Sequence, residues 1–197
     1  TIQTVICGEI IPAVNTTPNA FELNRLFSIM RDKGCEYVIM EVSSHALAMG
    51  RVEGLHFNTA VFTNLTQDHL DYHNDMESYY LAKKKLFDMC DNAVINIDNE
   101  YGKRLFKEIR CKKVSVSLEN DADYIAKSLN LQSRFVEYKL LTDFINHIKV
   151  NIPGEFSVYN SLCAVAVCDF LQIERKTSIE ALKHFNGVKG RAEVIEN

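Results

Sequence analysis

Thr59-Ala60-Val61-Phe62-Thr63-Asn64 decides the fold, because it is an apolar run of strand length that ends at a polar side chain. One similar run precedes it, at residues 37–40, and two follow it, at residues 93–97 and 113–117. Short apolar runs bounded by polar residues are typical of strands buried on both faces, as in a parallel sheet. The sequence therefore predicts four strands of a mostly parallel sheet.

Helical patterns lie between these runs. Thr17-Pro18 is typical of a helix start, with Thr as the N-cap and Pro in the first helical position, and Gly34 is a typical helix end. Residues 76–89 and 101–109 predict two further helices. Strands that alternate with helices at this spacing predict right-handed crossovers. The expected fold is therefore α/β, with a doubly wound, mostly parallel sheet.

The pattern changes after about residue 121, where strand-like runs follow one another without helices between them. This predicts a small antiparallel patch over residues 121–152. The expected elements are strands at residues 124–131, 134–140 and 147–152, and then apolar helices at residues 158–171 and 178–185.

Composition excludes several classes of protein. The 197 residues carry 22 Lys+Arg against 26 Asp+Glu, a formal net charge of −4, which gives no electrostatic footprint for nucleic acid. No apolar run reaches the roughly 18–20 residues that span a bilayer, so no membrane association is expected. The six cysteines form no C-x-x-C pair, which disfavours a disulfide framework or a zinc site. A reducing, cytoplasmic compartment is expected, and the sequence does not indicate an oligomeric state.

Polar clusters follow three of the predicted strands, at residues 41–45, 64–73 and 96–99. In open α/β sheets, ligands bind at the carboxyl ends of strands. Glu41 and His69 have the side-chain types to share a hard cation such as Mg²⁺ with phosphate oxygens. Taken singly, Glu41 also fits a solvated loop carboxylate and His69 a structural histidine.

Other candidate side chains have simpler interpretations. Asp68, Asp71 and His73 are metal ligands by type, but their spacing does not make them converge in a loop, and solvated or capping roles are expected. Lys83 belongs to a run of three lysines on a predicted helix, and such runs are usually solvated faces. The single Gly-Lys step, Gly102-Lys103, lacks the spacing of a P-loop, so these residues contain no triphosphate cradle of the usual kind.

A set of motifs occurs in one order along nearly the whole chain, and together they resemble the Mur ligases, most closely the MurE type. The motifs are Thr16-Thr17-Pro18, Glu41-Val42-Ser43-Ser44-His45, Gly50-Arg51-Val52, Phe62-Thr63-Asn64-Leu65, Asp68-His69-Leu70-Asp71-Tyr72-His73, Ala82-Lys83, Asn96-Ile97-Asp98, Tyr159-Asn160 and Gly187-Val188-Lys189-Gly190-Arg191.

The resemblance implies ATP-dependent amide-bond formation in peptidoglycan synthesis, with ATP and Mg²⁺ as cofactors. ATP would phosphorylate the side-chain carboxylate of D-Glu in UDP-N-acetylmuramoyl-L-alanyl-D-glutamate. The amine of a diamino acid, meso-diaminopimelate or L-lysine, would then attack the acyl phosphate. Such a reaction depends on positioning and on neutralising phosphate charge.

The resemblance also implies roles for single residues. Glu41 and His69 match contacts to Mg²⁺. Lys83 matches a lysine that is carbamylated in the family, and the carbamate turns a cation into an anion that can hold Mg²⁺ against phosphate. The remaining matches are Thr16, Thr17, Ser43 and Arg51 to the UDP-muramoyl dipeptide, and Asn64, Asn160 and Arg191 to the nucleotide.

The match has gaps. A family P-loop and a uridine-binding domain are expected before residue 1, so residues 1–190 are interpreted as a truncated central ATP-binding domain and residues 191–197 as the start of the C-terminal ligase domain. This chain alone is expected to be inactive. Met49 stands where a Gln often contacts substrate, Asn99 replaces a frequent second Asp, and Ser157 stands where Asn is common.

Three alternatives remain open. One is another ligase of the superfamily, of the cyanophycin synthetase or folylpolyglutamate synthetase type. Another is a non-catalytic module that binds a sugar nucleotide, although such a module would not need Glu41, His69 and Lys83 together. The third is a metal hydrolase that uses the run of Asp and His residues.

Overall fold

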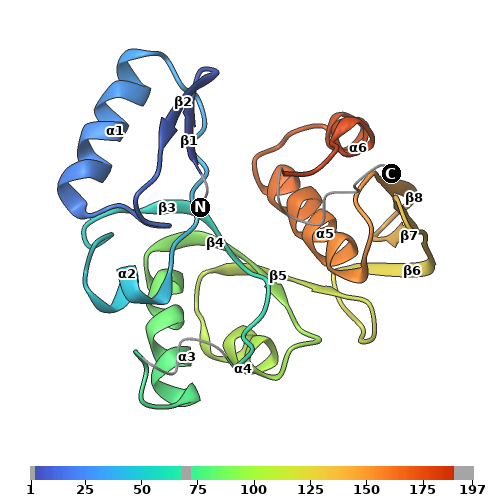
Figure 1. Cartoon of the computed structure of the whole chain (residues 1–197). Coiled ribbons are helices and arrows are strands. Elements are labelled where there is room, and N and C mark those ends of the chain that lie inside the picture. Colours follow the sequence, from blue (N-terminus) through green and yellow to red (C-terminus); the bar gives the residue numbers. More distant parts are fainter. Residues whose placement is uncertain (1–2, 68–71, 189–197) are drawn as a thin grey trace. The chain divides into compact units, whose positions relative to one another are not determined.

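The computed structural model describes residues 3–67 and 72–188 (Figure 1). The chain divides into two compact units. The first unit comprises residues 1–56 and 67–89, and the second comprises residues 57–66 and 90–197. Within the described residues, no helix has both the length and the hydrophobicity to cross a bilayer.

The second unit is built on one sheet of six strands, and their order in the sheet is their order in the chain. β3 to β6 run parallel, and β7 and β8 are antiparallel to their neighbours. The predicted α/β fold, its mostly parallel sheet and its antiparallel patch are therefore confirmed. The strands are β3 (Phe57–Phe62), β4 (Cys90–Asn96), β5 (Lys112–Ser117), β6 (Tyr124–Leu131), β7 (Val136–Leu141) and β8 (Ile145–Val150).

β4 is the most deeply buried strand. Ala93, Val94 and Ile95 are each 0% exposed. Because successive side chains of a strand point to opposite faces, this burial requires cover on both faces of the sheet. Helix α4 (Glu100–Glu108) contacts β4, and helix α5 (Glu155–Phe170) packs along the sheet from β3 to β8.

The main core lies between α5 and the sheet. The buried side chains of α5 that face it include Val158 and Leu162, which cluster with Val94, Val116 and Leu140 of the strands. Helix α6 (Arg175–His184) packs against α5 and β8.

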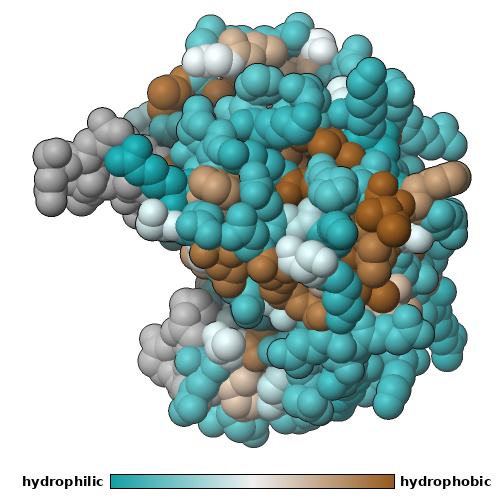
Figure 2. Space-filling view, turned by 90° about the vertical axis from the view of Figure 1, so that its right-hand side faces the viewer, coloured by the Kyte–Doolittle hydropathy of each residue, from teal (hydrophilic) through white to brown (hydrophobic). Residues whose placement is uncertain are grey.

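The antiparallel end of the sheet also exposes large apolar residues, among them Phe144 and Ile145. Figure 2 shows hydrophobic side chains reaching the surface among a mainly hydrophilic cover. Scattered exposed apolar residues of this kind are normal on folded domains.

Among its described residues, the first unit contains a hairpin and three α-helices, followed by a 3₁₀ turn. Cys7 and Gly8 form the two-residue loop of the hairpin, with φ of 49° and 86°, as a type I′ turn requires. The sequence did not predict this hairpin. Its elements are β1 (Gln3–Ile6), β2 (Glu9–Pro12), α1 (Ala20–Asp32), α2 (Ser44–Ala48), α3 (Met76–Lys84) and the 3₁₀ turn η1 (Lys85–Asp88).

Two predictions in the first unit are wrong. Residues 37–40 form no strand, and Ile39 is 96% exposed. A parallel strand exists only if a neighbour supplies its hydrogen bonds, and no described strand pairs with these residues. Helix α1 begins at Ala20 with Asn19 as its N-cap, since the hydroxyl of Thr17 is bonded elsewhere.

A substitution at Gly102 tests how closely α4 approaches β4. A Cβ at this position would lie 1.9 Å from the backbone oxygen of Asn96. We expect Gly102→Ala to lower the free energy of unfolding by about 2 kcal/mol, because the backbone must move to admit the methyl group. Urea denaturation followed by circular dichroism measures the change.

Lys107→Ala is the matched control, because Lys107 is exposed on the same helix and Ala preserves helix propensity. An equal effect of the two substitutions would contradict the close approach of α4 to β4.

Candidate active site

The hydroxyl of Thr17 organises the first group of predicted site residues. Thr17 is 1% exposed, and its Oγ1 donates to the backbone oxygen of Glu41 (3.0 Å) and accepts from the amide of Ser43 (2.9 Å). The segment before α1 is thereby joined to the loop before α2. Thr16 lies next to this junction with an exposed side chain.

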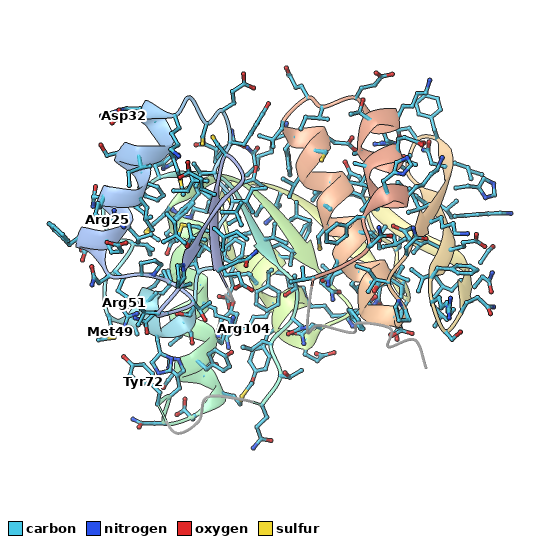
Figure 3. The ribbon with its side chains drawn as sticks, turned by 45° about the horizontal axis from the view of Figure 1, so that its top comes forward. Arg25, Asp32, Met49, Arg51, Tyr72 and Arg104 are labelled. Carbon is cyan, nitrogen blue, oxygen red and sulfur yellow. The ribbon has the colours of Figure 1, made fainter. Side chains whose placement is uncertain are left out.

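Arg51 completes the same group. Its Nη1 donates to the backbone oxygen of Thr17 (2.9 Å), and its Nη2 lies 3.4 Å from Sδ of Met49. Figure 3 shows Arg51 and Met49 close together at the end of α2. The structure therefore brings Thr17, Ser43 and Arg51 together, as expected for residues that share one ligand.

Ser43 also sets the start of α2. Its Oγ accepts from the amide of Ala46 at 3.2 Å and so caps the helix. Glu41 precedes this cap and is exposed.

A cluster of four rings links α2 to α3, and we call it the ring cluster: His45, Tyr72, His73 and Tyr79. His73 is 5% exposed, its Nε2 lies 2.9 Å from Oγ of Ser44, and its ring stacks on Tyr79 with centroids 4.9 Å apart. The ring of Tyr72 lies 3.6 Å from that of His45. His73 is thus a buried, hydrogen-bonded side chain and not the solvated residue that its spacing predicted.

Lys83 extends from the ring cluster on α3. Its Nζ lies 5.3 Å from the centroid of Tyr79, and burial lowers the pKa of the Lys83 ammonium. Within residues 3–67 and 72–188, no carboxylate forms an ion pair with it. Lys83 is therefore not the solvated lysine that its charge run indicates. A lysine with a lowered pKa holds more neutral amine at neutral pH, and neutral amine is the form that reacts with CO₂.

In the second unit, the end of β4 and the loop after it form hydrogen bonds with the segment around Asn64. Asn96 donates through Nδ2 to the backbone oxygen of Thr63 (2.8 Å), and Asn99 donates in the same way to that of Leu65 (3.1 Å). The two carbonyls flank Asn64, whose side chain is exposed. Asn99 also caps α4 by accepting from the amides of Tyr101 and Gly102.

Asp98 is the residue to which the sequence analysis assigned no role. Its carboxylate accepts from the amide of Leu118 (2.6 Å), from Nδ2 of Asn120 (2.6 Å) and from the hydroxyl of Tyr159 (2.9 Å). Burial alone would raise the pKa of Asp98, but these bonds and one from Ser117 hold it below its usual value. Tyr159 directly precedes Asn160, so Asp98 is bonded to the second turn of α5, where Asn160 is exposed. The available signal in the sequence was an Asp that directly follows a predicted buried strand.

The predicted site residues fall in three places. Thr16, Thr17, Glu41, Ser43, Arg51 and Lys83 lie in the first unit, and Asn64 and Asn160 lie in the second. His69 and Arg191 lie outside the described residues, as do Asp68 and Asp71. The binding roles of all of these residues stay predictions.

The fit to Mg²⁺ and ATP is partial. The carboxylate of Glu41 suits a hard cation. In the described part of the chain, no group of three or more His, Cys, Asp or Glu side chains converges as a metal site. A carbamate on Lys83 would add a second anionic oxygen ligand. The phosphates would need donors from other residues, because the chain has no P-loop motif.

Comparisons with known proteins agree on one family. The family model for the Mur ligase middle domain matches residues 1–168. A 2,6-diaminopimelate ligase acting on UDP-N-acetylmuramoyl-L-alanyl-D-glutamate from Caldanaerobacter subterraneus is 44% identical over 100% of this chain and 41% of the relative. A ligase of the same name from Clostridium botulinum is 41% identical over 99% of this chain. The chain spans about two fifths of the length of these relatives.

Solved structures give the same result. A structure of a ligase of that name matches with a TM-score of 0.85 and 27% identity, over 96% of this chain and 41% of its own. A MurF ligase from Thermotoga maritima in complex with ADP matches with a TM-score of 0.64 at 16% identity, which shows the fold alone.

The network around Asp98 predicts a pH-dependent stability. A carboxylate whose pKa is lowered by folding stabilises the protein above its unfolded pKa of about 3.9, and this is lost as pH falls through the folded pKa. Asp98→Asn should therefore cost about 2 kcal/mol at pH 7, because an NH₂ donor replaces one of the two acceptor oxygens and the negative charge is lost. It should also reduce the loss of stability between pH 7 and pH 3 in urea denaturation.

Asp121→Asn is the control, since Asp121 is an exposed carboxylate in the neighbouring loop. If the two variants have equal stability at pH 7, the carboxylate of Asp98 does not hold α5.

Proposed function

Because the chain belongs to the Mur ligase family, we propose that it is the central part of an enzyme that adds 2,6-diaminopimelate to UDP-N-acetylmuramoyl-L-alanyl-D-glutamate. The support is the identity of 44% with a relative of that name over the whole of this chain. The relative is longer, so the complete activity requires parts that the 197 residues do not contain. We assign residues 1–190 to the central domain and residues 191–197 to the start of the next domain.

We place this reaction in the cytoplasm, where ATP and reduced thiols are both present. The six cysteines support this assignment, because all are free in the structure. The proposed partners are the two small-molecule substrates, ATP and Mg²⁺.

Bound ATP with Mg²⁺ would supply an activated phosphoryl group for the D-Glu carboxylate. The chain's own residues would bind and orient that carboxylate. Arg51 is held by Thr17 through one nitrogen, which leaves further N–H groups of its planar guanidinium for an anionic part of the substrate. The hydroxyls of Thr16 and Ser43 lie on the same segments and would donate to the dipeptide.

Lys83 is the observation that carries the proposal. A half-buried lysine with no carboxylate partner in the described ranges costs stability, and a module that only binds a sugar nucleotide has no use for it. As a carbamate, Lys83 would provide an anionic ligand for Mg²⁺ beside Glu41. The hydrolase alternative is less well supported, because His73 is bonded to Ser44.

A chimera tests the function directly. Residues 1–197 would replace the matching segment of the Caldanaerobacter subterraneus relative, and the product formed from dipeptide, 2,6-diaminopimelate and ATP would be measured. We expect an active chimera, and we expect Lys83→Ala to lower kcat by about 100-fold or more, because an anion that neutralises phosphate charge is lost. Acetate should restore part of this loss by replacing the missing carbamate.

Two controls accompany the chimera. Lys85→Ala, on an exposed lysine two positions away, should leave kcat within about 2-fold. Lys83→Arg keeps the charge but cannot be carbamylated, so activity equal to the parent chimera would contradict the assigned role of Lys83. An inactive but folded parent chimera would contradict the proposed function.

Calorimetry of residues 1–197 tests which ligands this part of the enzyme binds on its own. We expect no heat from Mg-ATP, because the chain has no P-loop motif, and weak binding of the UDP-muramoyl dipeptide. Arg51→Ala should abolish the dipeptide signal, whereas Arg25→Ala, on an exposed arginine paired with Glu22, should not. Micromolar ATP binding would show that the phosphates are held by other residues of this chain.

A further inference from the structure

Cys7 and Cys35 lie side by side although they are 28 positions apart in the sequence. Their sulfur atoms are 3.6 Å apart, and one thiol donates to the other. Cys7 is exposed and Cys35 is partly exposed, so both can be reached by a small reagent. The distance between the two sulfur atoms must shorten by about 1.5 Å to reach the disulfide bond length of about 2.05 Å.

The backbone on both sides of this thiol pair is tied together. Cys7 occupies the turn between β1 and β2, and Cys35 follows the C-terminal end of α1. Nζ of Lys33 forms an ion pair with Glu9 at 2.7 Å, and the Cys7 thiol also contacts the backbone oxygen of Lys33 at 3.9 Å. The approach of the two sulfurs is therefore supported by neighbouring contacts.

Cys7 is also an unusual residue for its position. Its φ of 49° lies in the left-handed region, where a type I′ turn favours Asn or Gly. The turn would form more easily with Asn, so the thiol is present at a cost in backbone energy. This points to a use for the sulfur rather than for the backbone.

A second thiol pair serves as an internal comparison. The sulfurs of Cys90 and Cys111 lie 3.8 Å apart, but Cys90 is 7% exposed at the start of β4. Burial raises the pKa of the Cys90 thiol to about 12, so its thiolate is scarce at neutral pH. The sulfur–sulfur distance is nearly equal in the two pairs, whereas the accessibility of the thiols differs.

We propose that Cys7 and Cys35 are a reversible dithiol–disulfide pair that is oxidised by low-molecular-weight disulfides such as oxidised glutathione. The thiolate of Cys7 attacks one sulfur of the disulfide, forms a mixed disulfide and releases one thiolate. Cys35 then attacks the sulfur of Cys7 and releases the second. Two protein thiols lose two protons and two electrons, and one small disulfide becomes two thiols.

The order of attack follows from the structure. Cys7 is the more exposed of the two, and the hydrogen bond with Cys7 raises the pKa of Cys35. Cys7 is therefore the first to react, and Cys35 resolves the mixed disulfide.

The disulfide would close a ring over residues 7–35, which contains Thr16 and Thr17. It would link the hairpin turn to the end of α1. These two points flank, in the sequence, the segment that contains Thr17. The pairing itself does not depend on the proposed ligase activity.

The test oxidises the 197-residue chain at pH 7.5 with oxidised glutathione, blocks remaining thiols by alkylation, and identifies linked peptides by mass spectrometry without reduction. We expect a Cys7–Cys35 link that dithiothreitol reverses. We expect Cys90 to be oxidised at least 10-fold more slowly than Cys7, so that it is still alkylated when the link is complete.

Variants separate the two steps. Cys35→Ser should accumulate a glutathione adduct at Cys7, because no resolving thiol is present. Cys7→Asn suits the type I′ turn and keeps the fold, and it should remove the link and leave Cys35 largely unmodified. Cys111→Ser should leave the Cys7–Cys35 link unchanged.

Three results would overturn the proposal. One is a glutathione adduct that persists at Cys7 in the unaltered chain. Another is faster linkage of Cys90 to Cys111 than of Cys7 to Cys35. The third is equal reactivity of Cys35 in the unaltered chain and in Cys7→Asn.

Discussion

The burial of β4 on both faces is the constraint on which the second unit depends. Ala93, Val94 and Ile95 are fully removed from solvent, so the centre of this strand holds only apolar side chains. Polar contacts gather at the end of the strand and in the loop after it, where Asn96, Asp98 and Asn99 each hold a different neighbour. The sheet thus provides a buried apolar core, and the polar contacts lie at its carboxyl end, where ligands bind in open α/β sheets.

In the first unit, the candidate site residues are positioned by hydrogen bonds and not by a strand. Residues 37–43 form no strand, so the sheet cannot position Glu41 and Ser43. The buried hydroxyl of Thr17 does so through one donated and one accepted hydrogen bond. Such a junction is worth about 1 kcal/mol per bond, far less than a strand ladder. Its arrangement is therefore more easily changed by a ligand or a covalent link than that of the second unit.

Periodicity and composition predicted the larger elements, because burial sets both. The runs at 59–63 and 93–97 are mostly apolar because they pack on two faces, and they lie in β3 and β4. The run at 113–117, in which Val alternates with Ser, lies in β5. Composition does not indicate in the same way which strands pair with one another. The run at 37–40 is at least as apolar but has no described partner strand, and the hairpin turn at Cys7 lacks the usual Asn-Gly signal.

The candidate site was predicted unevenly for a related reason. Residue type and order indicated Thr17, Ser43 and Arg51, and the structure brings them together. The desolvation of Lys83 and the five donors around Asp98 depend on residues distant in the sequence, such as Tyr159. Contacts of this range cannot be read from spacing along one chain.

The three departures from the family pattern have local hydrogen-bonding roles. Asn99 donates to the backbone oxygen of Leu65, which an ionised Asp could not do. Ser157 donates to the backbone oxygen of Pro153 at 3.0 Å and secures the first turn of α5. Met49 offers Arg51 only a weak thioether acceptor, so less of the guanidinium's hydrogen-bonding capacity is used within the protein.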